Sequence, residues 1–189
     1  DKPFSISSTA AGGDTVSFSY GTGRELIRRA DANGTQVTRF AGGIEVLVSE
    51  NATRRQAAGA IVKKQGSTRS LSYVFTDHLG SVSAIVNASA VLQQRQSFDA
   101  YGARRAPANW DSWTLTQQFS FDTSHTRQGF TGHEGVERTG LIHFGGRLYD
   151  PRLGRFVQAD PLVEDANLTN GLNRYSYVLN NPLSLTDPT

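Results

Sequence analysis

The chain has 189 residues, enough for one domain or for a piece of a larger protein. Hydrophobic residues make up only 37% of it and glycine is frequent, with 19 residues, so many short strands joined by turns are expected rather than long helices. The lack of cysteine excludes a disulfide scaffold and a thiolate metal site, and the small net charge of +2, spread along the chain, argues against a nucleic-acid interface.

Alternating apolar and polar residues predict strands in the first half of the chain, because such strands have two different faces. The pattern occurs at residues 16–20, 44–48, 71–75 and 82–86. Turn signals separate these strands at Gly21-Thr-Gly23, Asn33-Gly34, Gly42-Gly43 and His78-Leu-Gly80. Residues 24–32 are also compatible with a helical turn, but a strand that enters the Asn33-Gly34 hairpin is favoured.

The turns recur at intervals of about 20 residues, which is typical of stacked repeats that bury an apolar face only against their neighbours. Two copies are clearest, at residues 18–34 and 96–104, and each has an aromatic residue and a glycine just before an arginine. Residues 105–128 interrupt the pattern and predict a variable loop with one short strand at residues 117–121. Trp110 and Trp113 in this loop either pin it to the sheet or stack on a sugar or a partner.

The last third of the chain carries a dense set of motifs. They are Gly-Phe-Thr-Gly-His-Glu at 129–134, Gly-Gly-Arg-Leu-Tyr-Asp-Pro-Arg-Leu-Gly-Arg-Phe at 145–156, Gln-Ala-Asp-Pro-Leu at 158–162 and Asn-Arg-Tyr-Ser-Tyr-Val-Leu-Asn-Asn-Pro-Leu-Ser-Leu-Thr-Asp-Pro-Thr at 173–189. Together with Thr-Asp-His-Leu-Gly-Ser at 76–81, this set closely resembles the RHS-repeat-associated core domain of bacterial RHS toxins and of the C component of insecticidal toxin complexes. Residues 71–189 are expected to form that core domain with its C-terminal plug, and residues 1–70 resemble ordinary YD-type repeats.

The resemblance implies an all-β fold with short helices, in which β-hairpins wind into part of a spiral shell that ends in an inward plug. A toxic domain would follow the core, sit inside the shell and be released by a single self-cleavage. In this family the cut falls just after an Asp-Pro-x-Gly-Leu motif. Asp187, Pro188 and Thr189 match its first three positions, and the glycine and leucine would follow Thr189.

Peptide hydrolysis by aspartates requires two carboxylates that share one proton, so that one accepts a proton from water while the other polarises the scissile carbonyl. By resemblance, Asp160 and Asp187 match the two catalytic aspartates and Arg147 matches a functional arginine. An arginine beside such a pair favours the charged form of a carboxylate and can hold the pair or the developing oxyanion.

A structural role is the alternative for each of these residues. Aspartate before proline commonly starts a turn, and Asp150, Asp160 and Asp187 all precede proline. Asp150 is therefore expected to cap a turn, with a supporting role at most. Arg155 is the main rival to Arg147, either in the charged role or as a residue that binds backbone carbonyls under the plug.

The resemblance also implies partners: the N-terminal remainder of the shell, the enclosed toxin, and a delivery, secretion or immunity protein. Export from a bacterium by a type VI, toxin-complex or similar route is expected. No cofactor and no membrane span are expected, and the four histidines lack metal-ligand spacing, so no metal site is expected either. No signal peptide opens the chain, and its abrupt ends are expected of a fragment or a processed product.

Two other functions remain open at this level. The first is a purely structural or binding module that encapsulates a cargo or contacts a delivery protein or a carbohydrate without cutting itself. The second is an adhesion ectodomain of an animal protein with similar repeats. The lack of cysteine disfavours the second, because disulfide-bonded modules would be expected beside such repeats.

Overall fold

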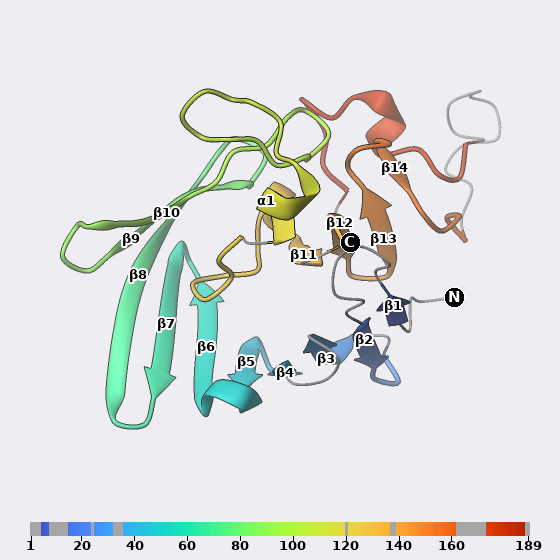
Figure 1. Ribbon diagram of the computed structural model, residues 1–189. Helices are drawn as coiled ribbons and strands as arrows, with labels where there is room; N and C mark the ends of the chain where they lie inside the picture. Colours follow the sequence, from blue (N-terminus) through green and yellow to red (C-terminus); the bar gives the residue numbers. More distant parts are fainter. Residues whose placement is uncertain are drawn as a thin grey trace. The chain divides into compact units, whose positions relative to one another are not determined.

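The computed structural model of the protein describes residues 5–7, 15–23, 25–31, 36–119, 121–136, 139–161 and 173–187. The chain divides into two compact units (Figure 1). The first takes Asp1–Phe75 and Ser83–Arg95, and the second takes Thr76–Val82 and Gln96–Thr189. Among the described residues, strands outnumber the few short helices, so the predicted all-β fold is confirmed. The repeat-to-core boundary after residue 70 stays a prediction.

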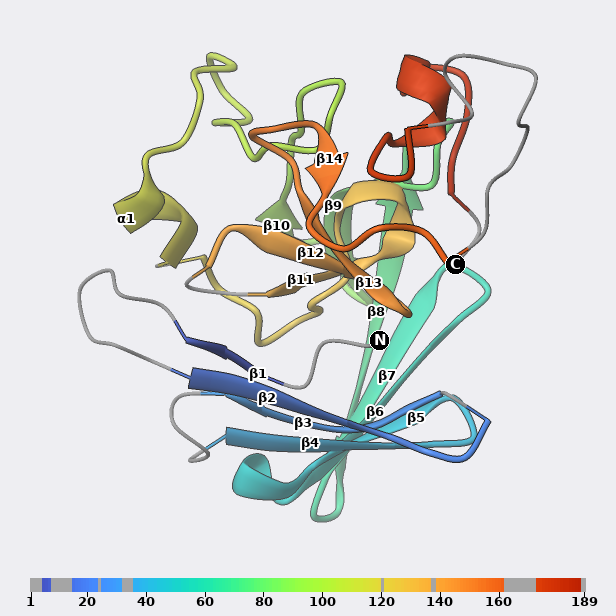
Figure 2. The same cartoon turned by 90° about the vertical axis from the view of Figure 1, so that its right-hand side faces the viewer.

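The first unit consists almost entirely of one antiparallel sheet, in which each strand pairs with the next along the chain (Figure 2). Its strands, in chain order and in sheet order, are β1 (Ser5–Ser7), β2 (Thr15–Tyr20), β3 (Leu26–Asp31), β4 (Gln36–Ala41), β5 (Ile44–Leu47), β6 (Ala52–Ala57), β7 (Ala60–Gln65), β8 (Thr68–Thr76), β9 (Val82–Asn87) and β10 (Leu92–Arg95). Such a meander needs only short connections, which the frequent glycines supply.

Four of the predicted strands are confirmed as β2, β5, β8 and β9, and the described part of the segment predicted over 24–32 forms β3 rather than a helical turn. The prediction is wrong at Val48, because a 3-10 turn over Val48–Glu50 begins there and ends at Asn51, whose φ of 49° is left-handed. Asparagine tolerates that conformation better than most residues. The predicted Asn33-Gly34 turn lies outside the described residues.

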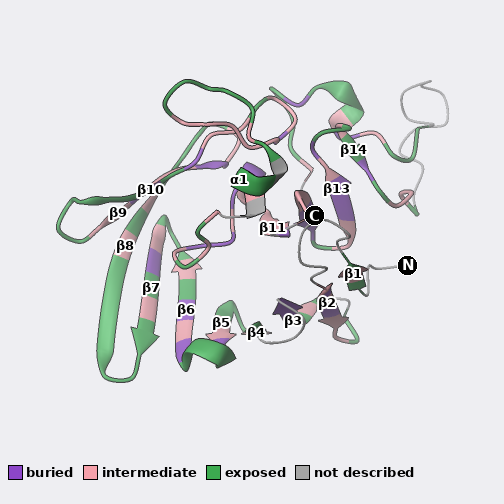
Figure 3. Ribbon diagram, viewed as in Figure 1, coloured by how far each residue is buried: buried purple, intermediate pink, exposed green. Residues whose placement is uncertain are grey.

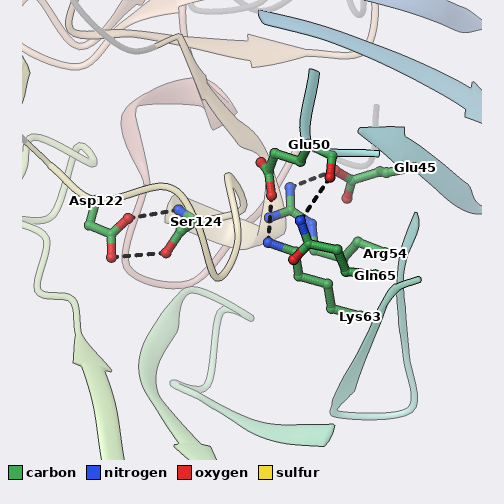
Figure 4. Close-up of polar contacts among 7 residues, drawn as sticks. All are labelled: Glu45, Glu50, Arg54, Lys63, Gln65, Asp122 and Ser124. Carbon is green, nitrogen blue, oxygen red and sulfur yellow. Dashed lines mark hydrogen bonds and ion pairs between the residues drawn. The ribbon is translucent and has the colours of Figure 1, made fainter. Parts of the chain in front are cut away.

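Paired charges line the middle of this sheet (Figure 4). Glu45 of β5 lies directly opposite Arg54 of β6, and Arg54 Nη2 lies 2.6 Å from Glu45 Oε2. Lys63 of β7 lies 2.6 Å from the carboxylate of Glu50, whose backbone carbonyl accepts a hydrogen bond from Gln65 at 2.8 Å. Opposite charges on facing strands stabilise the register of the pairing.

A short helix, α1 (Leu115–Phe119), occupies the place of the strand predicted at residues 117–121. The prediction was wrong because Thr114 and Gln117 form a capping box: the Gln117 amide donates to Thr114 Oγ1 at 3.3 Å, and the Thr114 amide donates to Gln117 Oε1 at 2.8 Å. After the helix, the Asp122 carboxylate accepts hydrogen bonds from the amide and the hydroxyl of Ser124 and tightens the next turn (Figure 4).

The second unit holds a four-stranded antiparallel sheet among its described residues: β11 (Glu134–Val136), β12 (Leu141–Phe144), β13 (Arg147–Asp150) and β14 (Arg155–Phe156). Buried residues lie on β13 (Figure 3), and the core of this unit is mainly aromatic. The buried members are Phe130, Ile142, Phe144, Tyr149, Phe156 and Tyr177. Tilted and edge-to-face ring pairs, which aromatic side chains prefer, dominate this core.

Tyr175 and Tyr177 are two residues apart, a spacing that predicts both rings on one core-facing side of a strand, but they do not share a core face. Tyr177 is fully buried and Tyr175 is 46% exposed. The amide of Ser176 donates to the Asn173 carbonyl at 3.0 Å, so the chain turns at this point and the two rings diverge. None of the helices in the described ranges is long and apolar enough to cross a membrane.

Replacing Phe144 by alanine should destabilise the second unit by about 3–5 kcal/mol, because its buried ring contacts several other rings and the remaining cavity cannot collapse. Phe75→Ala is the matched control, since that ring is 55% exposed, and it should cost less than about 1 kcal/mol. Urea unfolding followed by tryptophan fluorescence measures both changes. Equal effects of the two variants would contradict the assignment of the core.

Candidate functional site

Arg147 is the first residue of β13 and follows a two-residue Gly145-Gly146 turn from β12. Gly145 has a φ of 59°, which glycine adopts without steric cost. This tight hairpin pairs Arg147 with Phe144 across the two strands. The guanidinium lies 3.7 Å from the centroid of the Phe156 ring, so the aromatic core supports the charged group from beneath.

The Arg147 guanidinium binds two carboxylates at once. Its Nη1 lies 2.5 Å from Asp160 Oδ2, and its Nη2 lies 2.9 Å from Asp187 Oδ2. All three side chains are largely buried, with exposed fractions between 15% and 24%. The structure therefore brings together the three residues that the sequence singled out as catalytic candidates, although their catalytic role stays a prediction.

Asp160 is held by a residue that sequence reasoning missed. The Asp160 amide donates to the Arg174 carbonyl at 2.8 Å, and Arg174 Nε donates back to the Asp160 carbonyl at 2.5 Å. The segment just before Asp160 is tied to β13, because the Leu148 amide donates to Gln158 Oε1 at 2.7 Å. The Asn-Arg-Tyr motif at 173–175 was the available signal, but nothing in the sequence shows that its arginine reaches Asp160.

Asp187 is positioned by the closing segment of the chain. The Leu185 amide donates to the Asn181 carbonyl at 3.2 Å, and a ring nitrogen of His78 lies 3.1 Å from the Leu183 carbonyl oxygen. Pro182 is buried and anchors this segment. Pro188 and Thr189, the rest of the predicted cleavage motif, lie outside the described residues.

The two predicted supporting residues are arranged differently. The Asp150 carboxylate accepts hydrogen bonds from the amides of Arg152 at 2.9 Å and Leu153 at 3.4 Å, so it caps a turn, as predicted. Arg155 is exposed on β14, where its backbone pairs with Asp150 and Ser176. Among the described residues, Arg147 and not Arg155 forms the ion pairs with Asp160 and Asp187.

His133 and Tyr177 lie in the electrostatic field of Asp187. The His133 ring stacks on Phe144 with 3.8 Å between centroids, and its Nδ1 lies 2.9 Å from Thr131 Oγ1. Burial lowers the pKa of His133, and the charge of Asp187 opposes that shift. Burial raises the pKa of Tyr177 to about 12, and Asp187 acts in the same direction. The buried Tyr177 hydroxyl makes no well-aligned hydrogen bond among the described residues, although Thr131 and the Asp187 backbone lie near enough to moderate its pKa.

Two carboxylates beside an arginine are groups that can support hydrolytic chemistry. The positive charge of the arginine offsets the repulsion between the two carboxylates. An arginine at this position also stabilises negative charge that develops on a nearby carbonyl oxygen. Within the described ranges, no cluster of three or more histidine and carboxylate side chains is arranged to hold a metal ion.

The chain is similar to proteins from bacteria and from an animal. A family model described as Teneurin YD-shell matches residues 55–183. Toxin subunit YenC2 of Yersinia entomophaga is 43% identical over 67 residues, which are 35% of this chain and 6% of that protein. Salivary gland surface protein 1 of Aedes aegypti is 31% identical over 115 residues, which are 61% of this chain and 3% of that protein. The chain thus spans only a small part of the curated relatives it matches.

Solved structures share the fold over almost the whole chain. The crystal structure of TcdB2-TccC3-TEV aligns with a TM-score of 0.73 and covers 98% of this chain and 9% of the other. The sequence identity is 20%, so this likeness establishes the fold alone.

Replacing Arg147 by methionine should destabilise the second unit by about 1–3 kcal/mol, because it leaves two partly buried carboxylates without their cation. The double variant Arg147→Met with Asp160→Asn should recover part of that loss, since one of the two repelling charges is gone. Urea midpoints of the wild type, both single variants and the double variant give the coupling. Strictly additive changes would show that Arg147 and Asp160 do not interact.

Raising the pH above 10 should weaken the second unit. Burial raises the pKa of Tyr177 from its ordinary value of 10 to about 12, and burial raises the pKa of Tyr149 as well. The stability that comes from keeping these phenols neutral is fully present below pH 10 and is lost as the pH rises through the folded-state values. Urea midpoints measured from pH 8 to 12 should fall, and Tyr177→Phe should reduce the slope. An unchanged slope would show that Tyr177 ionises without hindrance.

Proposed function

Because the chain belongs to the Teneurin YD-shell family, we propose that it is the C-terminal part of a toxin shell that cuts its own backbone just beyond Asp187 and Pro188. The cut is a single intramolecular event of aspartic type, and it frees a toxic domain enclosed by the shell. Residues 1–70 would supply YD-type repeats, and residues 71–189 the core domain with its plug. The observation that carries the proposal is the binding of both Asp160 and Asp187 by Arg147.

The chemistry follows from that pair. With one proton shared between the two carboxylates, the ionised carboxyl accepts a proton from a water molecule while the protonated one donates a hydrogen bond to the scissile carbonyl. The resulting hydroxide adds to the carbonyl carbon, the carbon–nitrogen bond then breaks, and the leaving nitrogen takes up the proton. The two carboxyls act as one unit, so neither role is assigned to a particular aspartate.

The position of Asp187 supports an intramolecular reaction. Asp187 is both a ligand of Arg147 and the first residue of the motif that precedes the proposed cut. The bond to be cut is therefore tethered only a few residues from one of its own carboxylates, which gives a high effective concentration. The same tether explains why a single turnover is expected, because the cut chain end keeps occupying the site.

The wider assignment rests on the relatives. YenC2 is named a toxin subunit, and this chain matches a small part of it, which supports a role within a larger toxin assembly. The proposed partners are the remainder of the shell, the enclosed toxin, and a delivery, secretion or immunity protein. Export from a bacterium belongs to the same proposal.

The decisive experiment compares the full-length precursor with its Asp160→Asn form. The wild type should separate into two pieces that stay associated, the larger ending two residues beyond Thr189, whereas cleavage of the variant should slow by at least about 100-fold. Intact masses and sequencing of the new C-terminus measure this. Asp150→Asn is the matched control, because Asp150 also precedes proline but caps a turn that asparagine can still cap, and it should be cut like the wild type.

Two outcomes would overturn the proposal. Cleavage of Asp160→Asn at the wild-type rate would leave Asp160 as a turn residue and remove the aspartic mechanism. A wild-type precursor that stays intact would favour the alternative, a shell or binding module without catalysis. The exposed ring of Trp110, which stacks on Arg105 at 5.0 Å, would then be the first contact surface to test.

A further inference from the structure

A strained turn lies beside the carboxylate site. Thr131 forms the middle of the 3-10 turn over Phe130–Gly132, and its φ of 46° and ψ of 29° are left-handed. A β-branched residue is a genuine outlier in that conformation, where glycine would be free of strain. Strain of this kind persists only where the surroundings enforce it, and it concentrates at functional sites.

The surroundings that enforce it come from the motif at 76–81. The Thr131 amide donates to Ser81 Oγ at 3.1 Å, and the Val82 amide donates to the Gly129 carbonyl at 3.0 Å. Ser81 is itself held, because its amide donates to the Asp77 carboxylate at 2.8 Å. Two motifs far apart in the sequence thus meet to hold one threonine in an unfavourable conformation.

The strained conformation directs the Thr131 hydroxyl at His133, whose Nδ1 lies 2.9 Å away. The His133 ring stacks on Phe144, and Phe144 pairs across the hairpin with Arg147, which binds Asp187. A continuous series of contacts therefore runs from the strained turn to the second carboxylate. Stability alone does not require it, since a glycine at position 131 would form the same turn without strain.

We propose that Thr131 and His133 are positioning residues for the self-cleavage, which together hold Asp187 against Arg147 in the geometry that the paired carboxylates require. This inference rests on the proposed function. The Asp187 charge acts on His133 and on Tyr177, so both side chains are near enough to sense where that carboxylate lies. Hydrogen bonds among the residues that surround reacting groups fix the orientation of those groups.

The test uses three variants at one position in the full-length precursor. Thr131→Val removes the hydroxyl and keeps the shape, Thr131→Ser keeps the hydroxyl, and Thr131→Gly removes both the hydroxyl and the strain. Self-cleavage should slow by about tenfold in the valine and glycine variants and stay near the wild-type rate in the serine variant, as expected for one lost positioning hydrogen bond. The thermal midpoint of Thr131→Gly should equal or exceed that of the wild type.

His133→Phe tests the second residue, because phenylalanine can still stack on Phe144 but offers no nitrogen to Thr131. It should slow cleavage as much as Thr131→Val, and the double variant should be no slower than either single one, since both remove the same hydrogen bond. His143→Phe is the control, because that buried histidine lies on the opposite face of β12 from Phe144.

The outcomes separate this inference from the proposed function. Cleavage rates that follow the thermal midpoints, or a Thr131→Val precursor that is cut normally while Asp160→Asn is not, would overturn the inference and leave the aspartic mechanism standing. Normal cleavage of Asp160→Asn would overturn both. Slow cleavage in a fully stable Thr131→Gly protein, with rescue by serine, would establish the positioning role.

Discussion

The attachment of two carboxylates to the Arg147 guanidinium is the interaction on which the C-terminal part of this protein depends. Asp160 and Asp187 come from different segments, and each contact is to a different nitrogen of the same cation. Removing a charge from water is costly, so a largely buried arginine is tolerated only when its partners are in place. The segment that carries Asp187 must therefore pack beside Arg147 before the site is assembled. The cation thus links the folding of residues 173–187 to the assembly of the site.

The aromatic core makes that interaction possible. The Phe156 ring lies directly under the Arg147 guanidinium, and Phe144, which pairs with Arg147 across the hairpin, packs against the same ring at 5.5 Å. Rigid, closely packed rings hold a charged group with little freedom to rearrange. The first unit works in another way, because each short strand of its meander depends on the neighbouring strands and on paired charges such as Glu45 with Arg54.

The site is assembled from segments that lie far apart in the sequence. Residues 76–81 hold the strained turn at Thr131, residues 145–156 supply Arg147 and the ring beneath it, and the segment from 173 supplies both Arg174 and Asp187. None of these segments is a site by itself. Each segment must therefore present particular side chains to the others, which few residue types can satisfy.

The sequence by itself determined the all-β class, half of the strands of the meander and the capping role of Asp150, and it singled out the three residues that meet at the carboxylate site, because alternation, Asp-Pro turns and family motifs are local signals. It failed where two local signals competed: the capping box of Thr114 and Gln117 produced a helix at residues predicted to be a strand. Only the tertiary structure decided that Arg147 rather than Arg155 binds both aspartates, that Arg174 clamps Asp160 and that Thr131 is strained beside His133. Those relations join residues far apart along the chain, and spacing in sequence sets no distance in space until the core has packed.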